Sequence, residues 1–136
     1  MRFETSDGPL EIEISRVVVA GWTGRDEAGV RHHIEELAAI GVPPPSAIPL
    51  CYAVSAGRLT RAPVIEVLGA ATSGEAEPLV IRAEGALWLG LASDHTDRGL
   101  EAHSVAHSKA IAPKIAAHMN GRVRHHASAI CVGSRP

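Results

Sequence analysis

The spacing of apolar side chains predicts a chain built mainly from short strands, with an amphipathic helix near the N-terminus. Alternating apolar residues over 10–14 and a β-branched run over 16–22 indicate strands, because side chains two apart share one face of a strand. Apolar residues at helical spacing predict a helix over 27–40, with Asp26 as its N-cap and Gly41 just after its end. The pattern favours a β-rich α+β fold.

Further along the chain, apolar runs over 50–56 and 63–69 also read as strands, and the stretch GVPPPSAIP before them predicts an extended connector. Residues 97–109 favour a second helix. From residue 118 onward neither the helical nor the strand period persists. We therefore expect one domain over 1–117, followed by a divergent and poorly ordered tail over 118–136.

The most informative pattern is a predicted hairpin that carries acidic residues near its open end. Two apolar runs, over 75–83 and 86–93, are separated by a Glu-Gly pair, which is the spacing of a β-hairpin. Counting outward from this turn in antiparallel register places Asp94 opposite Glu75. Glu77 shares the face of Glu75, because it lies two residues further along the strand. The simplest register therefore brings three carboxylates together.

Two interpretations of these carboxylates stay open at this point. Like charges at close range raise one another's pKa or require a cation, and Mg²⁺, Mn²⁺ or Ca²⁺ prefers carboxylate oxygen. Alternatively, a Glu-x-Glu pair at a strand end is ordinary solvated charge, and a register slip of one residue would turn Asp94 to the other face. Pro78, which directly follows Glu77, indicates an edge position or a bulge.

Composition narrows the classes of function. Hydrophobic residues make up 46% of the 136 residues and aromatic residues 3%, and the net charge is −2, so no basic surface for nucleic acid is expected. Cys51 and Cys131 lie far apart, which gives neither a thiolate metal motif nor a disulfide framework and fits a cytoplasmic protein. The apolar runs are too short to span a membrane.

Three motifs match one known family. They are AGWTGRD followed by HHIEELA, then SGEAE, and then SDHTDR followed by EA and SK. Through these motifs the chain resembles the fumarylacetoacetate hydrolase superfamily over roughly residues 17–114, and it is most similar to a bacterial branch of unassigned function. The resemblance implies that Glu75, Glu77 and Asp94 bind Mg²⁺, Mn²⁺ or Ca²⁺.

The resemblance also implies roles for residues outside the carboxylates. It implies that His33 and Glu36, on a helix that is often a mobile lid, activate water or shuttle a proton. Lys109 is a weaker match to a family lysine near the substrate carboxylate. Three further residues are candidates for binding substrate: Thr23 and Arg25 as an anion pocket, a role that the guanidinium suits, and His95 as a hydrogen-bonding neighbour of Asp94.

Two sets of histidines have competing interpretations. His33 and Glu36 are helix neighbours, and without the resemblance they would be an exposed pair on an amphipathic helix, with His32 solvated. His103 and His107 have the i, i+4 spacing of a zinc-binding pair if one helix carries both. That spacing alone is common, and no Glu follows His103 as a metalloprotease motif requires.

The chain also departs from the family pattern. Asp26 stands where relatives have Asn, Pro78 follows the Glu pair, and the chain ends where relatives continue. We therefore expect a fumarylacetoacetate-hydrolase-like fold that is incomplete at its C-terminus. The predicted function is a divalent-metal-dependent hydrolase or lyase of a small 2-oxo or 1,3-dicarbonyl carboxylic acid, with a homodimer as a further expectation. The alternative is a truncated, catalytically inactive family member.

Overall fold

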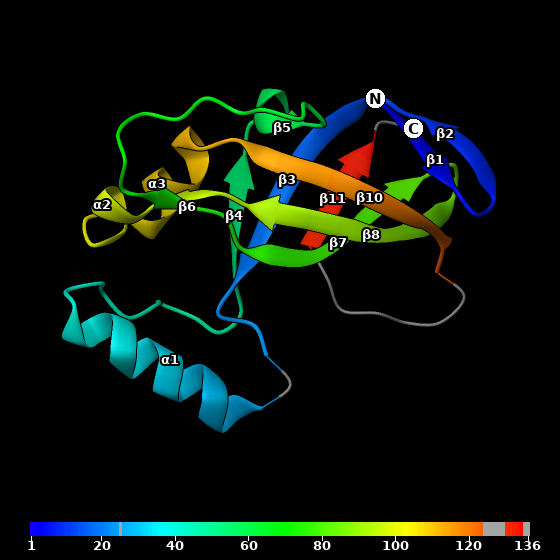
Figure 1. Cartoon of the computed structure of the whole chain (residues 1–136). Coiled ribbons are helices and arrows are strands. Elements are labelled where there is room, and N and C mark those ends of the chain that lie inside the picture. The colour runs from blue at the N-terminus through cyan, green and yellow to red at the C-terminus, as the bar shows by residue number, and fades with distance from the viewer. Residues whose placement is uncertain (25, 124–129, 135–136) are drawn as a thin grey trace.

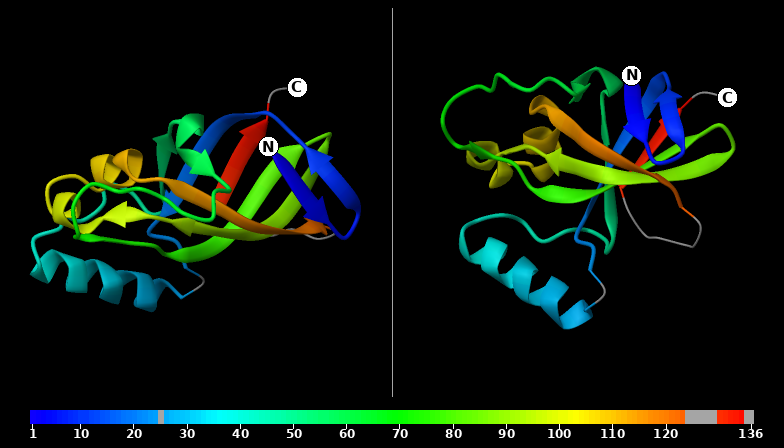
Figure 2. Two further views of the ribbon diagram at one scale, coloured as in Figure 1. Left: turned by 45° about the horizontal axis from the view of Figure 1, so that its top comes forward. Right: turned by 45° about the vertical axis from the view of Figure 1, so that its right-hand side comes forward.

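The computed structural model describes residues 1–24, 26–123 and 130–134, and these form a β-rich α+β fold (Figure 1). Its main sheet has seven strands in the order β4-β3-β11-β7-β8-β10-β5. Their bounds are β3 (Ile14–Gly21), β4 (Leu50–Val54), β5 (Leu59–Thr60), β7 (Ala76–Ala83), β8 (Ala86–Asp94), β10 (Lys114–Arg122) and β11 (Ile130–Ser134). The sheet curls around a buried core, as the two views in Figure 2 show.

Smaller elements flank this sheet at its two ends. One end carries the hairpin of β1 (Arg2–Thr5) and β2 (Gly8–Glu11), which was not predicted. The other end carries a two-stranded ladder of β6 (Thr72–Ser73) and β9 (Thr96–Asp97), together with α2 (Arg98–Glu101) and α3 (Val105–Ile111). A 3₁₀ turn, η1 (Ala56–Arg58), precedes β5.

The core is formed by aliphatic side chains and a few large aromatic ones from both halves of the chain. Strands β7 and β8 show how it forms, since Ile81 on one strand is fully buried opposite Trp88 on the other. Buried side chains of β3 and β10 pack against this pair, as does Phe3 of the N-terminal hairpin. Few aromatic residues are enough to build this core, because Trp88 and Phe3 are both buried in it.

The predicted hairpin is confirmed in both turn and register. Strands β7 and β8 are antiparallel, with Ala83 opposite Ala86. The two turn residues, Glu84 and Gly85, have φ angles of 52° and 71°, and positive φ at both positions is typical of the tight turns that match strand twist. At the open end the register continues, since the Asp94 amide donates to the Glu75 carbonyl at 2.9 Å.

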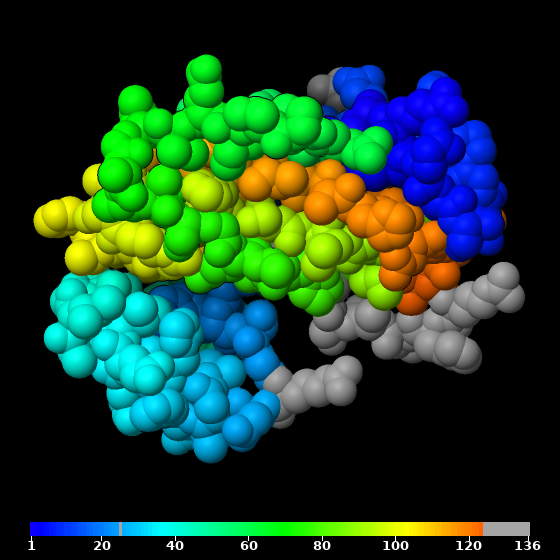
Figure 3. Space-filling view, in the orientation of Figure 1, coloured from blue at the N-terminus to red at the C-terminus, as the bar shows by residue number. Residues whose placement is uncertain are grey.

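Helix α1 (Glu27–Ala39) confirms the predicted helix and its caps. The Asp26 carboxylate accepts hydrogen bonds from the amides of Ala28 and Gly29 at 3.0 and 3.1 Å. Gly41 has a φ of 91°, the left-handed conformation that ends helices. None of the residues of α1 is buried, and Figure 3 shows the helix standing against the side of the molecule near α2.

Two predicted elements are wrong. Residues 63–69 form no strand; Val64 and Leu68 are 77% and 82% exposed, because no neighbouring strand offers this apolar run a partner. The helix predicted over 97–109 is interrupted between α2 and α3. Ser104 breaks it by acting as an N-cap, with its hydroxyl accepting from the His107 amide at 3.2 Å.

The C-terminal residues also differ from the sequence prediction. Strand β10 runs to Arg122, and β11 pairs with both β3 and β7, so the expectation that residues from 118 onward add no strand is wrong for 118–122 and 130–134. These strands form because they pair with strands distant in sequence, and the spacing of apolar residues along the chain does not indicate such pairing. Residues 124–129 and 135–136 of the expected tail lie outside the described residues. The division into a domain and a tail stays a prediction.

Candidate metal centre and adjoining pocket

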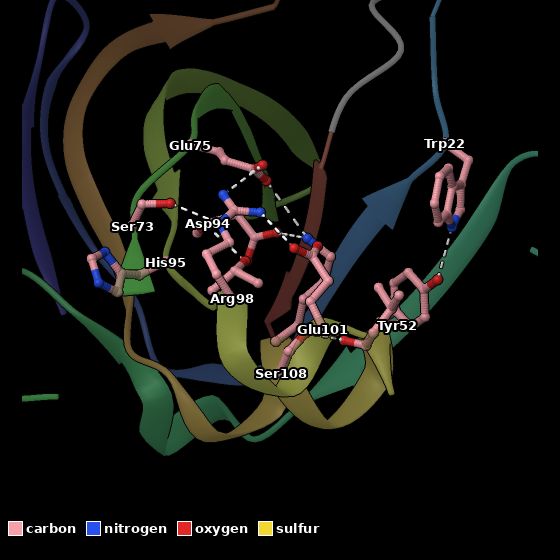
Figure 4. Close-up of polar contacts among 12 residues, drawn as sticks. Trp22, Tyr52, Ser73, Glu75, Asp94, His95, Arg98, Glu101 and Ser108 are labelled. Carbon is pink, nitrogen blue, oxygen red and sulfur yellow. Dashed lines mark hydrogen bonds and ion pairs between the residues drawn. The ribbon is translucent and has the colours of Figure 1, made fainter. Parts of the chain in front are cut away.

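Three acidic side chains meet where β7 and β8 reach the open end of their hairpin. They are Glu75, just before β7, Glu77 on β7, and Asp94 at the end of β8. One carboxylate oxygen from each lies within 4.8 Å of the others. The predicted clustering is confirmed, and the hairpin register causes it. We call these three residues the carboxylate cluster; Figure 4 shows Glu75 and Asp94 within one group of polar contacts.

Asp94 is the buried centre of the cluster, and two lysines neutralise it. Its side chain is fully buried. Lys109 Nζ lies 2.5 Å from Asp94 Oδ2 and 3.7 Å from Glu75 Oε2, while Lys114 Nζ lies 2.8 Å from Asp94 Oδ1. Lys114 reaches this position because it stands directly opposite Asp94 where β10 pairs with β8. Asp94 is therefore fixed by the sheet on one side and by α3 on the other.

Arg98 fixes the second carboxylate. Its guanidinium donates to Glu75 Oε1 at 2.8 Å, to Glu101 Oε2 at 3.0 Å and to the Ser73 hydroxyl at 2.7 Å, as the dashed lines in Figure 4 show. The pairing of β6 with β9 holds Ser73 close to Arg98. Burial lowers the pKa of Arg98, but Glu75 and Glu101 outweigh it and raise the pKa overall. Glu75 is thus oriented by a charged and triply bound side chain.

Glu77 differs from the other two carboxylates. Within the described parts of the chain it makes no ion pair of 4.0 Å or less. Burial is the main cause that raises its pKa to about 7; the negative charge of Asp94 and, less strongly, that of Glu75 add to the rise, and the positive charges of Lys109 and Lys114 oppose it. Near neutral pH its negative charge is therefore unfavourable unless a proton or a cation joins the cluster.

The two lysines respond oppositely to the same surroundings. Burial lowers the pKa of Lys109, yet Asp94 and both glutamates more than offset it, so the pKa of Lys109 rises. For Lys114 burial prevails over the attraction of Asp94, and its pKa falls. Lys109 is therefore the firmly charged member of the pair, and it lines the pocket beside the cluster.

A pocket of about 590 Å³ adjoins the cluster. Its charged side is formed by Glu75, Glu77, Glu101 and Lys109. Its apolar lining comes mainly from Trp22, from Val30 and Leu37 of α1, and from Val105 of α3. The pocket therefore has the composition of a small-molecule site, in which a few polar groups orient a ligand against apolar walls.

The predicted His33–Glu36 pair lies on the helix side of this pocket. His33 lines the pocket, and its Nδ1 lies 3.6 Å from Glu36 Oε2. Glu36 is also 3.3 Å from Nε2 of His32, whose side chain is 72% exposed as predicted, so two histidines share one carboxylate. The side chains of His33 and Glu36 are 61% and 59% exposed. Solvent weakens such pairs, so α1 holds its charges far more loosely than the sheet does.

The predicted substrate-binding residues have different outcomes. Thr23 lines the pocket and is exposed, whereas Arg25 lies outside the described residues. His95 is not among the pocket residues, and Figure 4 shows its ring turned away from the carboxylates. Its carbonyl accepts from Lys114 Nζ at 2.5 Å, so its main chain supports the cluster. Successive residues of an extended chain point to opposite sides, which explains why His95 does not follow Asp94.

The histidine pair considered for zinc loses its structural basis. His103 lies before the N-cap of α3 and His107 lies within that helix, so one continuous helix does not carry both. Across the described residues, the carboxylate cluster is the one group of three or more metal-binding side chains that share a suitable geometry. The sequence analysis gave no role to Arg98, Glu101 or Lys114, although Arg98 and Glu101 lie in its quoted motifs SDHTDR and EA. A signal existed for Lys114, because it opens an apolar stretch directly after Pro113.

Comparison with known proteins shows the family of the chain. The family described as Protein of unknown function (DUF2848) matches residues 20–129. The chain belongs to this family. The DUF2848 match includes the whole carboxylate cluster, both lysines and every residue named above as lining the pocket. No curated protein and no solved structure matches the chain. In the described part of this DUF2848 member, no helix has the length and apolar character needed to cross a membrane.

Proposed function

We propose that the chain is a divalent-metal-dependent hydrolase or lyase, with a fold like that of the fumarylacetoacetate hydrolase superfamily, acting on a small 2-oxo or 1,3-dicarbonyl carboxylic acid. One observation carries the proposal. The oxygens of Glu75, Glu77 and Asp94 lie within 4.8 Å of one another beside a pocket of about 590 Å³. Three carboxylates at this spacing suit Mg²⁺ or Mn²⁺, and Ca²⁺ accepts the same oxygen ligands.

The donor set fits a hard divalent cation in two respects. All three donors are carboxylates, and Glu77 has no ion pair within 4.0 Å among the described residues. The pKa of Glu77, raised to about 7 mainly by burial, marks a site that favours an additional positive charge. Glu75 and Asp94 are already oriented by Arg98 and the two lysines, which support the ligands from outside.

In this proposal the bound metal supplies Lewis-acid stabilisation of the negative charge that develops on a substrate carbonyl oxygen. Lys109 offers its charged ammonium group, on the pocket surface, to the substrate carboxylate. His33 accepts a proton from water or substrate at the helix side of the pocket, and Glu36 stabilises the resulting imidazolium. Lys114, buried behind Asp94, holds that carboxylate in place.

A second candidate is a catalytically inactive family member whose acidic cluster is only a structural ion-pair network. A specific observation favours it: Lys109 Nζ already contacts Asp94 at 2.5 Å and lies 3.7 Å from Glu75, so a lysine supplies part of the positive charge. Ion-pair networks also perturb pKa values without any catalytic role. The two candidates differ in whether Mg²⁺ changes what the protein does.

The proposal is tested by incubating the protein with Mg²⁺ and two probes, oxaloacetate and an acylpyruvate, and following the loss of their ultraviolet absorbance. We expect turnover that a chelator abolishes and that Mg²⁺ restores. Glu77→Gln should remove it, whereas Glu66→Gln, which removes one charge from an exposed loop, should not. If neither probe is turned over faster with Mg²⁺ and protein than with Mg²⁺ alone, the inactive candidate is the better one.

A further inference from the structure

Trp22 is the largest apolar side chain that lines the pocket, and its backbone is held in an unusual conformation. It follows β3 directly and has a φ of 59°. Bulky residues rarely adopt this left-handed region, because their Cβ atom crowds the backbone. Such outliers persist when the surrounding structure fixes them, and they cluster at functional sites. The contacts of Trp22 show what fixes it.

Tyr52, on β4, holds the indole ring of Trp22 in place through a hydrogen bond. The Trp22 Nε1–H donates to the Tyr52 hydroxyl at 2.9 Å, and Figure 4 shows this pair set apart from the carboxylates. The ring of Tyr52 lies over Gly21, where a Cβ would come within 2.8 Å of Tyr52 Cε2. A residue larger than glycine at position 21 would therefore displace the anchor. Tyr52 itself packs against the core, so it offers a firm support.

The position of Trp22 gives the pocket an apolar wall beside the candidate base. Its ring centroid lies 6.1 Å from that of His33, with the two planes inclined at 44°. Val30 and Leu37 of α1 extend this apolar side, and the acidic residues and Lys109 form the charged side. A ligand that fills both sides has oxygens at one end and an apolar group at the other.

We infer that Trp22, positioned by Tyr52, determines specificity by selecting acids that carry a flat apolar substituent at the end opposite the oxygens bound at the carboxylate cluster. The placement of those oxygens rests on the proposed function. Aromatic faces attract planar groups in offset or tilted stacks, and a wall held by a hydrogen bond has little freedom to adapt to smaller substrates.

The test compares two probes that share the 2-oxo acid group, pyruvate and phenylpyruvate, by calorimetric titration of the Mn²⁺-loaded protein. The parent should bind phenylpyruvate at least about tenfold more tightly. Trp22→Gly should abolish this preference. It is expected to fold, since glycine adopts positive φ without strain. Trp22→Phe should retain part of the preference. Tyr52→Phe should weaken phenylpyruvate binding and leave pyruvate binding unchanged, a selective effect that general destabilisation would not produce.

Fluorescence provides a second measurement on the same samples. Trp88 is buried in the core at 2% exposure, so quenching by phenylpyruvate should arise from Trp22 and vanish in Trp22→Phe and Trp22→Gly. Equal binding of the two acids by the parent, or no detectable binding of either, would overturn the inference. So would an unchanged preference in Trp22→Gly.

Titration with Mn²⁺ alone separates this inference from the proposed function. One outcome is that Mn²⁺ fails to bind while the preference for phenylpyruvate persists in metal-free buffer and depends on Trp22. In that case the metal proposal is wrong and the specificity role of Trp22 is supported. If Mn²⁺ binds and the two acids bind equally, the metal proposal is supported and the specificity role of Trp22 is wrong.

Discussion

The carboxylate cluster and helix α1 border the same pocket, yet they are held in place by different forces. Asp94 is 1% exposed and contacts two lysines, and its strand β8 pairs with β7 on one side and with β10 on the other. Helix α1 has no buried residue, and its His33–Glu36 pair is well over half exposed. The sheet therefore supplies a fixed geometry, and the helix supplies groups that water screens and that small free energies can move.

This difference divides the proposed work of the site. A metal requires ligands at fixed positions. The buried Asp94 and the half-buried Glu75 are held in place by charged partners, and the half-buried Glu77 lies on the same sheet. A group that exchanges protons with solvent or substrate benefits from exposure and from freedom to approach. The comparison predicts large effects for changes at Asp94 and small effects on stability for changes on α1.

The largest effect is expected from Asp94→Asn. The substitution keeps the shape of the side chain but leaves the ammonium groups of Lys109 and Lys114 without their buried counter-charge. Breaking a buried ion pair from one side costs about 3 kcal/mol or more. Urea denaturation should show a loss of this size relative to the parent. A loss below about 1 kcal/mol would mean that solvent reaches this carboxylate and that the sheet does not hold it more rigidly than α1 holds its own charged side chains.

The second effect is a dependence of stability on pH that originates at Glu77. Folding raises its pKa from the ordinary 4.5 to about 7, chiefly through burial, so the folded state holds a proton that the unfolded state has lost. The contribution of Glu77 to the free energy of unfolding is thus greatest below about pH 4.5 and declines as pH rises toward 7. The decline should be smaller in Glu77→Gln, measured by denaturation in metal-free buffer. An equal decline in both proteins would assign it to other groups.

A smaller effect is expected at the start of α1. Asp26→Ala removes a carboxylate that accepts from the amides of Ala28 and Gly29. Loss of an N-cap costs about 1 kcal/mol. Because α1 buries no residue, we expect the loss to appear first as local opening, with faster hydrogen exchange along α1 and unchanged exchange in β7 and β8. Equal acceleration in the strands would show that helix and sheet unfold as one unit.

The smallest effect on stability is expected for Glu36→Gln. Its ion pairs with His32 and His33 are exposed, and such pairs contribute less than about 1 kcal/mol. If His33 is the general base, turnover should nevertheless fall, by up to about 100-fold, because Glu36 stabilises the imidazolium of a base whose usual contribution is at least that large. A variant with both stability and turnover unchanged would leave α1 without a chemical role.

The contrast between the two regions also explains which features were predictable from sequence. The cluster follows from local rules: a two-residue turn fixes the register, and the strand period then brings Glu75 and Asp94 together. Helix α1 follows from its caps, which act within one turn of the helix. Both inferences use residues close in sequence or linked by a single hairpin.

The features that were missed depend on nonlocal packing. Lys114 reaches Asp94 only because β10 pairs with β8, and Arg98 reaches Glu75 only because β6 pairs with β9. The apolar run over 63–69 looks like a strand but finds no partner, so its side chains remain exposed. The interruption between α2 and α3 depends on whether Ser104 caps a helix or continues one, and local propensity does not decide this.

The central claim, that the carboxylate cluster is a metal site, is tested most directly by calorimetric titration of the metal-free protein with Mn²⁺. The parent and the surface control Glu66→Gln should each bind one ion per chain. Glu77→Gln should bind at least about tenfold more weakly, because it removes a charged ligand. Absence of Mn²⁺ binding by the parent, or equal affinity in Glu77→Gln, would contradict the account and identify the cluster as an ion-pair network that needs no metal.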